Sequence, residues 1–95
     1  MIKKKKFVLN RYYLLKEGNG ISTGVYFPSS YNKNYVIGKC IFAGKRSATI
    51  QVMDKSFKGH SATPSLTDTS TDKWYFVNEN IVKELTLDEV MVEEL

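Results

Sequence analysis

The segment from Tyr35 to Met53 constrains the fold more than any other part of the chain. It opens with an apolar run, YVIGKCIFA, which is followed by the tight-turn residues Gly44, Lys45 and Arg46. From Ser47 onward, small or apolar residues alternate strictly with mostly polar ones. Strict alternation is typical of a half-buried strand, and two such runs around a short turn form a β-hairpin. We therefore expect a hairpin at the centre of a β-rich fold.

Other segments extend the β pattern on both sides of this hairpin. Residues Phe7–Leu15 are dense in aromatic and branched side chains, and Ile21–Phe27 resembles a second strand beyond a Gly-Asn turn. Towards the end of the chain, Lys73–Val77 and Ile81–Leu85 are short strand-like runs. The pattern thus predicts five or six strands.

The last ten residues, TLDEVMVEEL, predict a short helix. Thr86 and Glu89 have the spacing of a capping box, in which each residue hydrogen-bonds the other's backbone N–H. Leu87, Val90, Met91 and Leu95 then share one side at helical spacing. An isolated helix of this length is unstable in water, so we expect it to pack on the sheet or on a partner.

Two stretches resemble known small barrels. Trp74–Leu85 (WYFVNENIVKEL) is similar to the way SH3-type chains pass through one helical turn into a final strand. The hairpin within Val36–Val52 resembles the glycine-centred hairpin of KOW and Tudor-type barrels. The resemblance covers residues 35–85 and implies a mainly β fold, a small antiparallel SH3-like barrel of five or six strands with a short C-terminal helix. The acidic loop and groove proline of signalling SH3 domains are missing, so the resemblance does not imply binding of proline-rich ligands.

Length and composition predict a single domain over residues 1–95. Within it we expect a flexible basic tail at 1–6, a long polar loop rich in Ser and Thr at 59–72, and an acidic helix at 86–95. One cysteine, Cys40, fits a reducing compartment, and no apolar stretch approaches membrane-spanning length. The strong bias to Lys over Arg fits a bacterial or phage origin. The expected localisation is therefore cytoplasmic, in a bacterial cell or a phage-infected host, with no membrane contact.

Little in the sequence points to catalysis. His60 is the only histidine and lies in a polar loop, where an exposed side chain is the simplest interpretation. One Cys and one His cannot build a four-ligand zinc site, and no phosphate-binding glycine motif occurs. We expect a protein that is not an enzyme, with no catalytic residues, metal or cofactor.

The charge is divided along the chain. Residues 1–60 hold twelve of the fourteen Lys and Arg residues but only two of the ten Asp and Glu residues. Cations with interspersed tyrosines are typical of nucleic-acid binding, in which lysines contact phosphates with low sequence specificity. The leading expectation is a non-enzymatic accessory or regulatory module that binds DNA or RNA. Its candidate residues are Lys3, Lys4, Lys5, Lys6, Arg11, Tyr31, Lys39, Lys45, Arg46, Lys55 and Lys58.

The acidic end supports an alternative function, a protein-interaction module such as a small phage-type inhibitor or adaptor of a larger enzyme. Its candidate contacts are Trp74, Tyr75, Leu87, Val90 and Met91. The sequence leaves open whether the acidic helix closes the barrel, folds back onto the lysines or docks on a partner. It also leaves the oligomeric state open.

Overall fold

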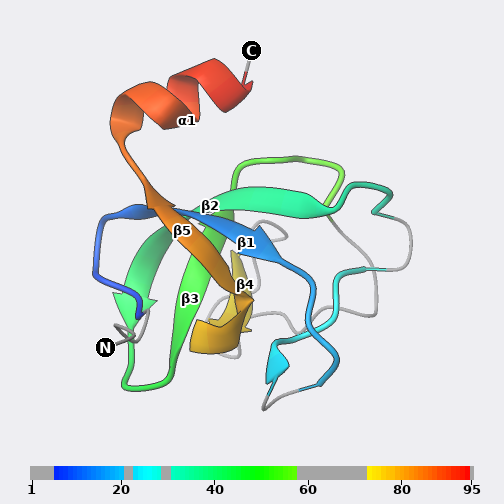
Figure 1. The fold of residues 1–95 in the computed structure, drawn as a ribbon. Coiled ribbons are helices and arrows are strands. Elements are labelled where there is room, and N and C mark those ends of the chain that lie inside the picture. Colours follow the sequence, from blue (N-terminus) through cyan, green and yellow to red (C-terminus); the bar gives the residue numbers. More distant parts are fainter. Residues whose placement is uncertain (1–5, 21–22, 29–30, 58–72, 95) are drawn as a thin grey trace.

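A five-stranded antiparallel sheet forms the body of the molecule. The computed structural model describes residues 6–20, 23–28, 31–57 and 73–94. The strands lie in the order β4-β3-β2-β1-β5 (Figure 1). The elements in chain order are β1 (Tyr12–Lys16), β2 (Tyr35–Ala43), β3 (Ser47–Val52), β4 (Lys73–Val77), the 3-10 turn η2 (Asn78–Asn80), β5 (Ile81–Leu85) and the helix α1 (Leu87–Glu94).

The predicted central hairpin is confirmed. Strands β2 and β3 pair antiparallel around residues 44–46, and the N–H of Gly44 donates to the carbonyl of Ser47 at 2.8 Å. The pairing shifts by one residue between Cys40 and Phe42, which is a β-bulge. A bulge increases local bending and twist, and β2 curves strongly along its length (Figure 1).

The inner face of the sheet holds the main core, in which aromatic side chains predominate. Phe57 packs edge-on against Phe27, Tyr31 and Trp74, with ring centroids 4.9–5.6 Å apart. Edge-to-face packing of this kind adds to the stabilisation from buried area. The buried residues of this core are Phe7, Tyr13, Leu15, Val25, Phe27, Tyr31, Val36, Cys40, Ala48, Ile50, Val52, Phe57, Trp74, Phe76, Val77 and Ile81.

The first strand is shorter than the pattern over Phe7–Leu15 predicts. It begins only at Tyr12, because a turn precedes it in which the N–H of Arg11 donates to the carbonyl of Val8 at 3.2 Å. Asn10 adopts a φ of 70° in this turn. Asn tolerates that left-handed conformation better than most residues, which explains why the chain bends there.

The second predicted strand, Ile21–Phe27, is not formed in its described part. Gly20 and Gly24 make an isolated bridge, and the chain from Val25 onward is irregular. Side chains hold part of its backbone: the N–H of Phe27 donates to the carboxylate of Glu17 at 2.8 Å.

The antiparallel five-stranded sheet agrees with the prediction, but the predicted closure into a barrel is not observed. Its edge strands β4 and β5 are joined through η2, and no ladder pairs them in the part of the chain that the structure describes. The single helical turn before the last strand and the short terminal helix agree with the sequence. The capping box is also confirmed, since the N–H of Thr86 donates to Glu89 Oε1 at 2.9 Å and the N–H of Glu89 donates to Thr86 Oγ1 at 3.2 Å.

The helix α1 packs on the outer face of the sheet, beside β1 and β5. Val90 is buried against Ile37 and Leu85, with Tyr12 and Leu14 packed around them. Among the described residues, no helix is both long enough and apolar enough to cross a bilayer.

Candidate functional site

The outer face of β2, β3 and β4 brings together cationic, polar and aromatic side chains. Residues that pair across neighbouring strands lie on the same face of a sheet. The register aligns Tyr12 with Lys39, Lys39 with Gln51, and Gln51 with Lys73, so these four form one row across β1, β2, β3 and β4. All four side chains are half-buried.

A second row lies beside the first, nearer the β2–β3 turn. Thr49 pairs with Phe42 on one side and with Tyr75 on the other. Phe42 is 67% exposed, which is unusual for a large aromatic side chain on a sheet. We call the two rows together the cation-aromatic face; its members are Tyr12, Lys39, Phe42, Thr49, Gln51, Lys73 and Tyr75.

The side chains of the cation-aromatic face include two cations, Lys39 and Lys73, and no carboxylate. Strands β2, β3 and β4 contain no Asp or Glu, whereas Lys39 and Lys73 lie on the face. The Lys39 ammonium lies over the Tyr12 ring, with Nζ 5.9 Å from the ring centroid. This cation–π contact holds Lys39 against the sheet without neutralising its charge.

The turn between β2 and β3 adds two further cations at the end of this face. Lys45 and Arg46 are exposed. The carbonyl of Arg46 accepts a hydrogen bond from the N–H of Asn78 at 2.9 Å, which fixes the turn against η2. The structure thus brings three of the predicted nucleic-acid contacts, Lys39, Lys45 and Arg46, to one region.

Arg11 does not join this region. Its Nη1 donates to both carboxylate oxygens of Glu84, at 3.1 and 3.2 Å. Glu84 lies opposite Tyr13, whereas Lys39 lies opposite Tyr12, so the Arg11–Glu84 pair is on the reverse side of the sheet. An acid from the negative end of the chain therefore neutralises this predicted contact.

Lys55 also lies apart from the β2–β3 turn, at the opposite end of β3. Its neighbours there include the ion pair between Lys33 Nζ and Asp54 Oδ2, at 2.6 Å. Lys33, followed by hydrogen bonds from Ser56, lowers the pKa of Asp54 to about 2. This end of the sheet therefore carries cations and a firmly ionised carboxylate together.

The structure corrects the role predicted for Tyr31. Its ring is only 8% exposed and packs between Phe27 and Phe57, so it is not available for stacking on a base. Its hydroxyl donates to the carbonyl of Tyr35 at 2.6 Å. Tyr31 is a core residue. Its neighbours in the sequence are polar, so the sequence did not predict its burial.

Two of the predicted protein contacts are likewise in the interior. Trp74 is 5% exposed, and its buried Nε1–H has no hydrogen-bond partner among the described residues. Val90 is 2% exposed because it docks α1 on the sheet. Tyr75 is half-buried on the cation-aromatic face, whereas Leu87 and Met91 are exposed on α1.

Several predicted residues lie outside the described part of the chain. Lys6 is described and exposed. The predicted contacts Lys3, Lys4, Lys5 and Lys58, together with His60 and the polar loop 59–72, fall on residues that the structure does not describe.

Five members of the cation-aromatic face were not among the predicted site residues: Tyr12, Phe42, Thr49, Gln51 and Lys73. Sequence patterns give the strands but not the register that aligns Lys73 with Lys39 through Gln51. The face on which Phe42 lies is also hard to predict, because the bulge shifts the alternation of β2 by one residue. Identifying these residues as members of one face requires the complete set of strand pairings.

The described residues show no group of three or more His, Cys, Asp or Glu side chains that could hold a metal ion. Cys40 is fully buried, and this burial raises the pKa of its thiol above the ordinary value. Comparisons with protein-family models, with curated proteins and with solved structures found no match to this chain.

Proposed function

We propose that this protein binds single-stranded nucleic acid on the cation-aromatic face, as a non-enzymatic accessory or regulatory module. The observation that carries the proposal is the register of the sheet, which places the exposed ring of Phe42 on the same face as Lys39, over strands that carry no carboxylate. Single-strand binding proteins combine aromatic platforms for bases with cations for the backbone.

The parts of the face have separate roles in this proposal. Phe42 is the stacking platform, since its ring is the most exposed aromatic surface on the face. Lys39, Lys45 and Arg46 contact phosphates, and Thr49 offers hydrogen bonds to bases or sugar. Lysine contacts a phosphate as a point charge, so recognition is dominated by the backbone and has low sequence specificity.

The arrangement of the strands supports an SH3-like fold as part of the same proposal. The order β4-β3-β2-β1-β5, the strongly bent β2 and the 3-10 turn between β4 and β5 are all features of that arrangement. A small sheet of this kind does not itself specify a function, so the proposal rests on the face and not on the fold.

The test is a fluorescence-anisotropy titration with labelled oligothymidine, oligouridine and a duplex of equal length, repeated over a range of salt concentrations. We expect both single strands to bind more tightly than the duplex, with an affinity that falls steeply with salt. Phe42→Ala should weaken single-strand binding about tenfold, the loss expected for one stacked base.

Charge variants provide a matched comparison. Arg46→Gln should weaken binding and reduce the salt slope by about 1, as expected for one lost phosphate contact. Arg11→Gln removes the same charge from the reverse side of the sheet and should leave the titration unchanged. Equal effects of these two variants, or no binding even at low salt, would show that the proposal is wrong.

A further inference from the structure

The helix α1 presents large apolar side chains to solvent. Leu87 is 59% exposed, Met91 is 61% exposed and Val92 is 70% exposed, whereas Val90 is the residue that packs on the sheet. A cluster of exposed apolar side chains on one short element marks an interaction surface, because leaving it in water is unfavourable. This surface lies on the same side of the sheet as the cation-aromatic face, with Tyr12 packed between them against the cluster of Val90 and Leu85.

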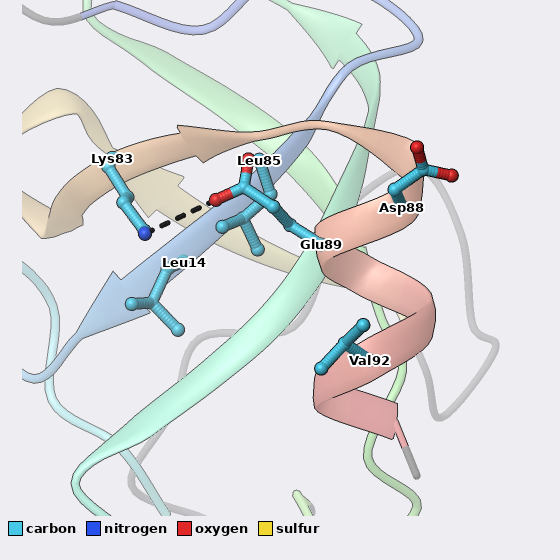
Figure 2. Close-up of a pocket in the computed structure, with 6 residues that line it drawn as sticks. All are labelled: Leu14, Lys83, Leu85, Asp88, Glu89 and Val92. Carbon is cyan, nitrogen blue, oxygen red and sulfur yellow. Dashed lines mark hydrogen bonds and ion pairs between the residues drawn. The ribbon is translucent and has the colours of Figure 1, made fainter.

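A groove runs between α1 and the sheet next to these side chains. Leu14 and Leu85 on the sheet and Val92 on the helix line a cavity of about 310 Å³. Figure 2 shows Val92 across the groove from Leu14, with the ion pair between Lys83 and Glu89 on one side. The groove thus has an apolar lining and a charged rim.

The rim and the helix are negative. The sequence of α1, LDEVMVEE, contains four acids and no base. Hydrogen bonds from the backbone N–H and the hydroxyl of Thr86, together with Lys83, lower the pKa of Glu89, so this carboxylate stays ionised at neutral pH. Among the residues that the structure describes, Lys83 is the one cation that lines the groove, and it already pairs with Glu89 at 3.4 Å.

This charge distribution determines which kind of partner the groove can bind. A second copy of the chain that docked through α1 would place acidic helices side by side, and like charges at close range disfavour that contact. A segment with an apolar stripe flanked by Lys and Arg has the complementary pattern. Its apolar residues would cover Leu14, Leu85 and Val92, while its cations would face Asp88 and Glu89.

We propose that the groove between α1 and the sheet binds a cationic amphipathic helix of a partner protein. Together with the proposed function, this would make the chain an adaptor with two neighbouring surfaces, although neither proposal depends on the other.

The test uses two synthetic peptides of about 18 residues, or five helical turns, with leucines at the same helical spacing. One peptide carries lysines at all other positions and the other carries glutamates. We expect the lysine peptide to bind with a stoichiometry of one per chain, and the glutamate peptide not to bind. Val92→Ser should weaken the lysine peptide about tenfold, because Val92 forms one wall of the groove.

Controls separate groove binding from general attraction to an acidic surface. Leu9→Ser removes an exposed apolar side chain elsewhere and should leave peptide binding unchanged, as should Phe42→Ala. Val92→Ser should in turn leave the oligonucleotide titration unchanged. If Val92→Ser bound the lysine peptide as tightly as the unmodified chain, the proposal would be overturned.

The same variants examine self-association. Sedimentation of the chain alone should give a monomer at concentrations at which the lysine peptide binds. A dimer that dissociates on Val92→Ser would assign the groove to a second copy and would also overturn the proposal.

Discussion

Asn80 holds Val25 through two hydrogen bonds: its Oδ1 accepts from the Val25 N–H at 3.0 Å, and its Nδ2 donates to the Val25 carbonyl at 3.1 Å. The same side chain accepts from the N–H of Val77 at 3.2 Å and donates to the carbonyl of Lys16 at 2.8 Å. Asn80 is completely buried. One amide therefore ties the end of β1, the irregular segment 23–28 and the end of β4 together.

Replacing Asn80 by alanine should destabilise the fold strongly. Asn80→Ala would leave backbone groups of Val25, Val77 and Lys16 without their partner, and buried polar groups without hydrogen bonds are costly. We expect a loss of about 3 kcal/mol in the free energy of unfolding, measured by urea denaturation. Asn34→Ala, at an exposed position, is the matched control and should change stability by less than about 0.5 kcal/mol. Similar losses for the two variants would contradict this role of Asn80.

The close approach of Gly38 to Ile50 leads to a second prediction. A Cβ at position 38 would collide with Cγ2 of Ile50, which is completely buried and has no room to move. Gly38→Ala should therefore cost about 1–3 kcal/mol of stability through overpacking.

A double-mutant cycle identifies the cause of that cost. Leucine has no methyl branch at Cβ, so Ile50→Leu removes the atom that the new Cβ at position 38 would strike. Gly38→Ala should then be less destabilising in the Ile50→Leu background than in the unmodified chain. An equal cost in both backgrounds would mean that this contact is not responsible.

The features that sequence reasoning predicted correctly depend on local signals. The central hairpin follows from strict alternation around Gly44–Arg46, and the start of α1 follows from the spacing of Thr86 and Glu89. In both cases, residues only a few positions apart make the interactions that define the element.

The features that were missed depend on distant contacts. Tyr31 and Asn80 lie in polar stretches that resemble exposed loops, yet both are buried because segments far along the chain close over them. The cation-aromatic face has the same origin, since Lys39 and Lys73 share a row only through the pairing of both strands with β3. Local pattern defines strands, but register and burial are properties of the folded chain.

Asp54 should make stability depend on pH in the acidic range. Lys33 and Ser56 lower its pKa from 3.8 to about 2, so the folded chain binds this proton more weakly than the unfolded chain does. The resulting stabilisation is present above about pH 4 and is lost as the pH falls towards 2.

The variant Asp54→Asn isolates this effect. It should be less stable than the unmodified chain at pH 6, by about 1 kcal/mol. The loss is no larger because solvent screens the charge of the exposed Lys33. The difference should shrink between pH 4 and pH 2, as followed by urea denaturation at several pH values. A difference that stayed constant across this range would rule out titration of Asp54 as its source.

The docking of α1 through Val90 leads to the last prediction. Val90 is buried against Ile37 and Leu85, and an eight-residue helix has little stability without such packing. Val90→Ala should accelerate amide hydrogen exchange in α1 about tenfold, while the amides of β3 keep their protection. Alanine is a better helix former than valine, so faster exchange would report lost packing and not lost propensity. Val92→Ala makes the same chemical change at an exposed position and should not accelerate exchange. If both variants accelerated exchange, the contact of Val90 with the sheet would not be what stabilises the helix.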